Sequence, residues 1–330
     1  MPATARFALR QLLRFAVLML AVSFVCFALV SASPIDPLQA NIGQNALLGM
    51  SDERRAQLAS YWGTNTPLIE RYTSWLAGVL HGDWGTSLRF DAPVTQVIAN
   101  RAANSLAMMA LAWLVSGILG FCLGVLAAAK RGSWIDRIVK GYCYLIAATP
   151  AFWIGLLMLM VFSVALHWFP MGFSVPIGVS AADATIFDSL QCMVLPALTL
   201  SLTGVANIAL HTREKAIDVI EGDCMRFARS RGLGLWPALR HHGLRNLMLP
   251  ALTLQCASIS EIFGGSVLVE QVFSYPGLGQ AAVTAGLGAD APLLVGIALV
   301  SAALVFAGNL VANLAYGVVD PRIKAGEAYD

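Results

Sequence analysis

The sequence predicts an all-α integral membrane protein with six transmembrane helices. Of its 330 residues, 58% are hydrophobic and only 12% are charged, and the mean hydropathy is +0.70. A water-soluble domain of this length with that composition would aggregate. The apolar runs are about 20 residues long and lack the period-two alternation of barrel strands, so helices, which satisfy their own backbone hydrogen bonds, are expected to span the bilayer.

Six apolar runs follow one another, each bounded by charged residues or by Pro and Gly. The predicted spans cover residues 15–33, 104–129, 141–166, 193–210, 247–268 and 292–319. This divides the chain into an N-terminal segment with the first helix (1–33), a long outer loop (34–103), a five-helix core (104–319) that contains a polar loop at 212–246, and a C-terminal tail (320–330). An even number of spans places both termini on one side of the membrane.

The distribution of Lys and Arg predicts which side that is. Of the 21 basic residues, 16 lie before the first span, in the 130–140 connection, in the loop at 213–245 or after the last span. The short connections 167–192 and 269–291 contain acidic residues but no Lys or Arg. Because cytoplasmic loops carry the excess of Lys and Arg, both termini are predicted to be cytoplasmic. The other five basic residues lie in the outer loop, and long loops cross the membrane largely regardless of charge.

The outer loop is expected to contain two short helices on the membrane surface. Ser51 precedes acidic residues in the manner of an N-cap, and Pro67 opens a second helix. The apolar stripe of this second helix consists of Leu68, Tyr72, Trp75, Leu76 and Val79. Two interpretations remain open: the helices pack over the spans, or they form a platform for a binding protein.

The N-terminus has the three Arg residues and the apolar run of a signal peptide. Its run of about 18 residues is longer than a signal core, and Pro34 directly follows the small residues at 31–33. We therefore expect an uncleaved first helix.

The sequence contains no constellation for catalysis, for a metal or for nucleotide hydrolysis. Its six cysteines are scattered singly without a CysXaaXaaCys spacing, which is typical of small packing residues. Its five histidines form no HisGluXaaXaaHis pair, and no Gly-rich loop ends in GlyLys followed by Ser or Thr. We expect neither an enzyme nor a resident cofactor or metal ion.

The segment 213–245, called the basic loop below, is the clearest functional feature. It carries seven Lys or Arg residues between two apolar runs. Apolar residues such as Met225, Phe227 and Leu233 alternate with the charges, which favours a short amphipathic helix ended by Gly232 in a left-handed conformation. A helix of this kind can dock in a groove of a partner, although an ordinary solvated loop has similar composition.

Several motifs resemble one transporter family over almost the whole chain. They are GlyAspTrpGlyThrSer at 82–87, AlaThrProAlaPheTrpIleGly at 148–155, MetArgPheAlaArgSerArgGlyLeu at 225–233, ValGluGlnValPheSerTyrProGlyLeuGlyGln at 269–280 and AspProArgIle at 320–323. Their order and spacing are similar to those of permease subunits of ATP-binding-cassette importers, in the dipeptide, oligopeptide and nickel branch. Arg226 replaces the first acidic position of the general family motif, as is usual in this branch.

The resemblance implies a type I importer permease with a long periplasmic loop after its first helix, in the bacterial inner membrane. The basic loop would then couple the spans to an ATPase through Arg226, Ala228, Arg231, Gly232 and Leu233. The implied partners are a second homologous permease, two ATPase subunits that bind ATP and Mg, and a periplasmic or lipid-anchored substrate-binding protein. Membrane lipid surrounds the chain, and no nucleic acid is expected.

Three residues are candidates for the translocation pathway. Pro150 is expected to break or kink the third span, with Trp153 just after it. Glu261 is the acidic residue deep in a predicted span, where an ionisable group is costly and marks a functional site unless it serves only a structural hydrogen bond. The stretch IleSerGluIlePheGlyGly at 259–265 resembles some nickel-type members more closely than it resembles peptide-type members. This resemblance favours a metal complex as the cargo. Gly117, Gly120 and Gly124 would allow close helix contact, within this subunit or with a second permease.

Two other function classes were weighed. A secondary transporter or channel would account for six spans and Glu261, but it predicts inverted repeats and several intramembrane charges. A membrane enzyme would require a catalytic constellation, which the sequence lacks. The cargo itself is not encoded in any motif of the chain.

Overall fold

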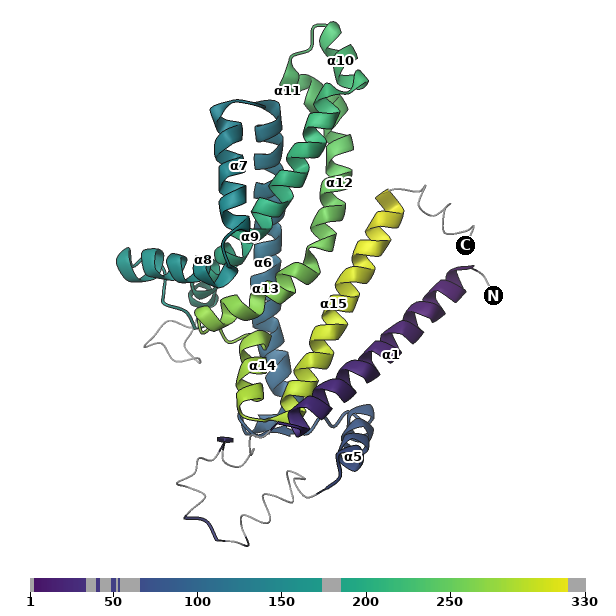
Figure 1. Cartoon of the computed structure of the whole chain (residues 1–330), viewed down its shortest axis with the longest axis vertical. Helices are drawn as coiled ribbons and strands as arrows, with labels where there is room; N and C mark the ends of the chain where they lie inside the picture. Colours follow the sequence, from purple (N-terminus) through teal and green to yellow (C-terminus); the bar gives the residue numbers. More distant parts are fainter. Residues whose placement is uncertain are drawn as a thin grey trace. The chain divides into compact units, whose positions relative to one another are not determined.

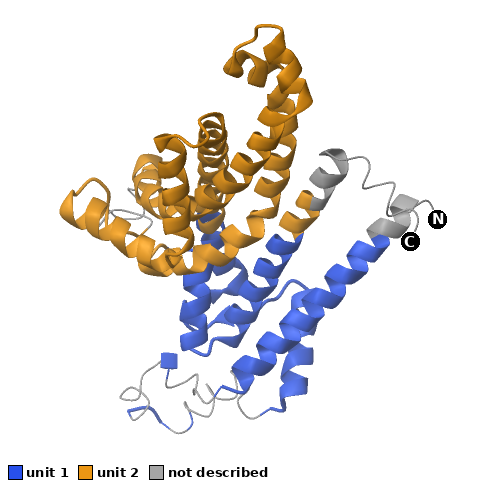
Figure 2. Ribbon diagram, turned by 45° about the horizontal axis from the view of Figure 1, so that its top comes forward, with its two compact units in different colours: residues 1–104, 276–306 blue, residues 105–275, 307–330 orange. Residues whose placement is uncertain are grey.

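The computed structural model describes residues 3–33, 40–41, 49–51, 53, 66–173 and 185–319. The helix expected at Ser51, much of the outer loop and the tail at 320–330 therefore lie outside the described residues. The chain forms two compact units, one of residues 1–104 with 276–306 and the other of residues 105–275 with 307–330 (Figure 2). Within the described residues given above, the secondary structure of both units is helical apart from one two-stranded ribbon.

The first unit contains α1 (Ala3–Ser31), α5 (Leu68–Leu80), strands β1 (Thr86–Ser87) and β2 (Ala92–Pro93), the start of α6 (Val94–Ala129), α14 (Leu278–Leu287) and most of α15 (Ala291–Val319). The stripe predicted on α5 faces α1. The hydroxyls of Tyr72 and Ser23 lie 2.9 Å apart, and the Trp75 ring packs on Phe27. Packing over a span is therefore the observed role of this face of α5.

The GlyAspTrpGlyThrSer motif supplies β1, which pairs antiparallel with β2 beside a buried carboxylate. Gly82 and Gly85 adopt positive φ angles, and Asp83 accepts a hydrogen bond from the Gly85 amide. Asp290, fully buried, accepts hydrogen bonds from the Ser87 hydroxyl at 2.7 Å and from the Leu293 amide at the start of α15. The motif thus anchors the N-terminus of the last long helix.

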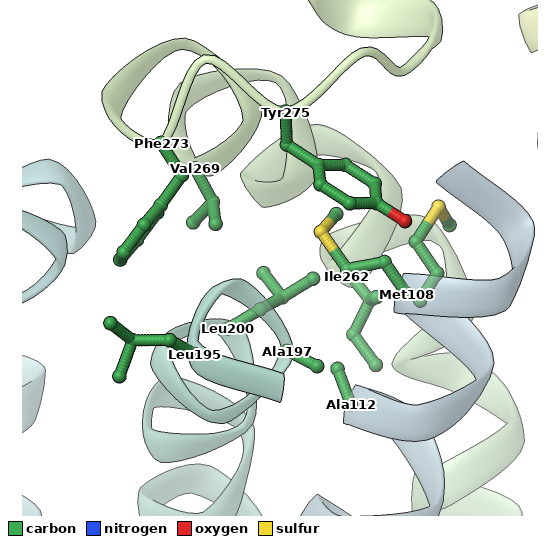
Figure 3. Close-up of a cluster of buried hydrophobic side chains, with 10 residues drawn as sticks. Met108, Ala112, Leu195, Ala197, Leu200, Ile262, Val269, Phe273 and Tyr275 are labelled. Carbon is green, nitrogen blue, oxygen red and sulfur yellow. The ribbon is translucent and has the colours of Figure 1, made fainter. Parts of the chain in front are cut away.

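The second unit contains the rest of α6, α7 (Trp134–Ala147), α8 (Ala151–Met158), the π-helix η1 (Leu159–Ala165), α9 (Ile186–Glu221), α10 (Asp223–Ser230), α11 (Leu235–Ala238), the π-helix η2 (Leu239–Gly243), α12 (Leu244–Ala257) and α13 (Ile259–Val272). Its main core joins residues of α6, α9 and α13, including Met108, Leu195 and Val269 (Figure 3). Tyr275 is buried in the same core. Burial is the larger cause that raises the pKa of its hydroxyl to about 12, and the nearby Glu270 carboxylate adds to it.

The three glycines of α6 contact helices of the same chain. A Cβ atom at Gly124 would lie 2.7 Å from the Thr212 Cβ on α9, and one at Gly120 would lie 2.8 Å from the Ile208 Cβ. Gly117 faces the Gln255 side chain of α12 at a similar distance. The close contact expected from small-residue spacing is therefore intramolecular.

Four helices in the described residues are long and apolar enough to cross a membrane, and two bent pairs raise the number to six if each pair is one span. The pairs are α7 with α8–η1, bent by 108°, and the segment 235–257 with α13, bent by 47°. The break expected at Pro150 within the span 141–166 is confirmed by the 108° bend, whereas no residue pattern predicted the 47° bend at Ser258 within the span 247–268. Pro150 breaks the first pair because proline has no amide hydrogen and its ring clashes with the preceding turn.

Candidate functional site

The basic loop folds into a compact knob. The predicted short helix is present as α10, which follows α9 after the extended residue Gly222. The structure also extends α9 to Glu221, so the first part of the basic loop continues a long helix. α10 and α11 lie together at the end of α9 and α12 opposite to α8 and α13 (Figure 1). The chain therefore connects α10 to α9 at one end and, through α11 and η2, to α12 at the other.

Two faces of α10 have different environments. Met225 is fully buried and Ala228 is 4% exposed, and both pack with residues of α6, α9, η2 and α12 in one apolar cluster. Since these residues are three apart, they form the inward face of the helix. Ala228, predicted from the resemblance as a coupling residue, thus contacts its own chain.

Gly232 ends α10 in the left-handed conformation predicted from the sequence. Its φ angle is +85°, its amide donates to the Arg229 carbonyl at 3.0 Å, and the Leu233 amide donates to the Ala228 carbonyl at 3.3 Å. These two bonds define a Schellman motif. Nothing lies within 4 Å of a Cβ placed on Gly232, so its backbone conformation, and not a lack of space, requires glycine.

The outward face of α10 presents one aromatic ring among charged side chains. Phe227 is 66% exposed, and the Arg231 guanidinium lies 5.8 Å from its ring centroid. A hollow of about 300 Å³ beside this ring is lined by Cys224, Phe227, Ala228, Arg231, Leu233 and His242. Arg226 and Arg229 are exposed next to it. An exposed aromatic ring beside a hollow, with arginines around it, is suited to docking on another protein.

A buried ion pair connects α7 to α9 below the knob. Asp136 is 1% exposed and receives two hydrogen bonds from Arg213, at 2.6 Å from Nε to Oδ1 and 2.9 Å from Nη2 to Oδ2. The Gly132 amide donates to the same carboxylate. Arg131 and Glu221 form a second, exposed ion pair. The bidentate geometry fixes the orientation of α7 on α9.

A cavity of about 450 Å³, called the Glu261 cavity below, lies in the same unit. Its walls come from the end of α7, the middle of α9, and the α12–α13 bend. The polar or charged lining residues are Thr149, Thr203, Asn207, His211, Ser258 and Glu261. The Asn207 side-chain amide donates to Oε2 of Glu261 at 3.3 Å.

The structure places the three pathway candidates differently. Glu261 lines the cavity, and Pro150 directly follows Thr149, which also lines it. Trp153 is half-exposed on α8 and is not part of the lining. The sequence interpretation did not select Thr203, Asn207 and His211, although their spacing of four residues on an apolar helix is a signal that could have identified them. It also did not pair Asp136 with Arg213, which are 77 positions apart.

The sequence matches a known family over most of its length. Residues 120–325 match "Binding-protein-dependent transport system inner membrane component", and residues 4–108 match the N-terminal part of the membrane component of such systems. The chain is 34% identical to the oligopeptide transport system permease protein AppB of Bacillus subtilis, covering 97% of this chain and 99% of that protein. It is 32% identical to the dipeptide transport system permease protein DppB of Escherichia coli, covering 92% of this chain and 94% of that protein.

A third relative is a putative peptide permease protein of Brucella suis, which is 35% identical and covers 97% of this chain and 99% of its own length. Full-length similarity of this kind, together with the apolar helices and the folded basic loop, assigns the family. The chain belongs to the inner membrane components of binding-protein-dependent transport systems, in the permease branch that includes the oligopeptide and dipeptide permeases.

Proposed function

We propose that this chain is one of two permease subunits of an ATP-driven importer, in which two ATPase subunits supply the energy and a periplasmic or lipid-anchored binding protein delivers the cargo. The observation that carries the proposal is the outward face of α10, where Phe227 and the hollow beside it are exposed on a knob joined to two long helices. ATP and Mg would bind to the partner subunits. The permease itself would neither hydrolyse ATP nor hold a cofactor.

The knob provides a mechanical connection from the ATPase to the pathway. In the proposed complex, a groove of an ATPase subunit holds the side chains of α10 and its C-terminal turn, which are Arg226, Phe227, Arg231 and Leu233. Closure of the ATPase subunits would therefore move α10. Because Met225 and Ala228 are buried in the cluster with α6 and α12, the knob would move as one body with those helices. Gly232 supplies the turn that presents Leu233 beside Phe227. The Asp136–Arg213 pair would carry the motion of α9 to α7.

The pathway would run past Glu261. Two helix interruptions, at Pro150 and at Ser258, adjoin the lining of the Glu261 cavity. Irregular backbone at membrane depth is tolerated where it lines a cavity. These bends are suitable hinges for opening and closing the cavity. Trp153, on the short helix that follows Pro150, would move with the first hinge.

The proposed architecture has six spans, with both bent pairs counted as spans, a long periplasmic loop at 34–103 and cytoplasmic termini. We expect a membrane-impermeant thiol reagent to label single cysteines placed near Arg55 and Asp183 in intact spheroplasts. Cysteines placed near Lys130 and Arg240 are expected to react only after permeabilisation, because 16 basic residues lie on their side. Labelling near Arg240 in intact spheroplasts would show that the orientation is inverted.

Purification in mild detergent tests the central proposal. We expect the tagged permease to co-purify with a second permease and two ATPase subunits, and reconstituted vesicles to import cargo only with ATP and the liganded binding protein. A chain that is recovered alone and still transports would instead be a secondary transporter or channel.

The named relatives favour a peptide cargo, whereas the 259–265 stretch favoured nickel or a metal chelate. Import by the same vesicles of a labelled dipeptide, and of Ni²⁺ with and without a chelator, separates these cargoes. Uptake of the peptide alone would support the peptide class. Uptake that requires the metal would support the metal complex.

A further inference from the structure

The Glu261 cavity is formed where two spans are interrupted. Thr149 lies at the break between α7 and α8, and Ser258 and Glu261 lie at the bend between α12 and α13. α9 supplies the remaining polar wall through Thr203, Asn207 and His211, which share one face because they are four residues apart. Polar side chains from three separate regions of the chain therefore converge on one open cavity, where Asn207, His211 and Glu261 are exposed and accessible to a ligand.

The charge of this cavity is carried by Glu261. Among the residues that line it, the other titratable group is His211, and no Lys or Arg of the described residues is part of the lining. Oε2 of Glu261 receives the bond from Asn207, while Oε1 makes no hydrogen bond or ion pair within the part of the chain that the structure describes. The carboxylate therefore retains one oxygen for a ligand.

The neutral polar groups add hydrogen-bond acceptors. The Thr149 hydroxyl donates to the Leu145 carbonyl at 2.7 Å, and the Thr203 hydroxyl donates to the Leu200 carbonyl at 2.9 Å. Because each hydroxyl has a single hydrogen, which is used within its own helix, only oxygen lone pairs remain for a ligand. The cavity thus offers one negative charge and several acceptors, beside the donor groups of the Asn207 amide and the His211 ring.

This chemistry favours a cation that donates several hydrogen bonds. We propose that the Glu261 cavity is a cation-selective station of the transport pathway, where Glu261 and the hydroxyl oxygens of Thr149 and Thr203 accept hydrogen bonds from a primary ammonium group of the cargo, as at the amino end of a peptide. The inference rests on the proposed importer function and specifies which part of the cargo the pathway recognises.

A directly bound metal ion fits these residues less well. The described residues contain no group of three or more His, Cys, Asp or Glu side chains that could hold a metal. One carboxylate and one imidazole leave most positions of a transition-metal ion without protein ligands. An ammonium group needs only acceptors, and the Glu261 carboxylate and the two threonine hydroxyls provide them.

Thiol chemistry in the cavity tests the proposal without requiring transport. In a cysteine-free form of the complete complex, Ala257→Cys places a reporter thiol in the lining, and Ser74→Cys places one on the exposed surface of α5. Both would be reacted with 2-aminoethyl, 2-trimethylammonioethyl and 2-sulfonatoethyl methanethiosulfonate. Rate ratios between reagents cancel any difference in thiol ionisation.

We expect the ratio of the aminoethyl to the sulfonatoethyl rate to be at least about tenfold larger at Ala257→Cys than at Ser74→Cys, because a nearby carboxylate attracts one reagent and repels the other. Glu261→Gln is expected to remove this difference, and Glu214→Gln, which changes an exposed carboxyl of α9, is expected to leave it intact. The combined Thr149→Val and Thr203→Val change is expected to remove the preference for the aminoethyl over the trimethylammonio reagent.

Two results would overturn the proposal. One is a charge ratio that Glu261→Gln does not change. The other is equal preference for the two cationic reagents in the unmodified cavity, since a trimethylammonium group cannot donate hydrogen bonds.

A transport measurement separates this inference from the importer function. With a free-amine dipeptide as cargo, Glu261→Gln is expected to lower the peptide imported per ATP hydrolysed at least about fivefold, while ATPase stimulation by the liganded binding protein persists. An unchanged import ratio would count against the cavity assignment alone. Absence of ATP-dependent import in the unmodified complex would instead contradict the proposed importer function, and the thiol result would still decide whether the cavity selects cations.

Discussion

Phe227→Asp is expected to release the permease from its ATPase subunits while leaving the permease folded. The ring is 66% exposed on α10 beside the hollow, so its replacement costs the isolated chain little. Loss of one aromatic anchor from a partner's groove typically weakens binding by about 2 kcal/mol, or roughly thirtyfold, and a buried carboxylate adds to this loss. Co-purification of the ATPase and ATP-dependent uptake measure the effect. Phe227→Leu, which keeps an apolar side chain, is the matched control.

Ala228→Asp provides the contrasting substitution at the adjacent position. Because Ala228 is 4% exposed inside the cluster with α6 and α12, its replacement buries an unpaired carboxylate in apolar surroundings. We expect several kcal/mol of destabilisation of the knob, seen as a lower unfolding midpoint together with lost uptake. Full ATPase binding by Phe227→Asp would contradict the docking face. A normal unfolding midpoint for Ala228→Asp would contradict the inward placement of this residue.

Asp136→Ala is expected to lower the free energy of unfolding strongly, because it leaves Arg213 without its partner. The Arg213 side chain is 15% exposed and that of Asp136 is 1% exposed, so solvent cannot replace the lost interaction. Removal of one member of a buried pair typically costs about 3–5 kcal/mol. Unfolding in mixed micelles with increasing SDS measures the loss, and Arg213→Leu is expected to give a similar value. The double variant Asp136→Leu with Arg213→Leu is expected to recover part of the stability, since both buried charges of the pair are removed and the remaining neighbour, Lys140, is 35% exposed.

The exposed pair formed by Arg131 and Glu221 is the control for this measurement. Its side chains are 56% and 60% exposed, and surface pairs of this kind contribute about 0–1 kcal/mol. Arg131→Ala is therefore expected to change stability far less than Asp136→Ala. Similar losses from the two substitutions would contradict the assignment of Asp136–Arg213 as the connection between α7 and α9.

Local features of the fold could be predicted from the sequence. The length and hydropathy of the apolar runs indicate membrane helices, because each residue contributes to the transfer free energy largely independently of distant residues. The helix of the basic loop and the turn at Gly232 were predicted for a similar reason. They depend on side-chain periodicity and on the freedom of one glycine to adopt a positive φ angle, here +85°. The break at Pro150 follows from the missing amide hydrogen of that residue.

Only the tertiary structure decided which faces of the helices meet. Hydropathy does not distinguish a lipid-facing side chain from one that faces a neighbouring helix, since both surroundings are apolar. The sequence therefore did not show that Ala228 faces its own chain, that Asp136 pairs with Arg213, or that Asn207 approaches Glu261. The 108° angle at Pro150 and the cavity lined by Glu261 likewise depend on contacts between distant segments. These contacts are set by the packing of whole helices, which no local pattern of residues specifies.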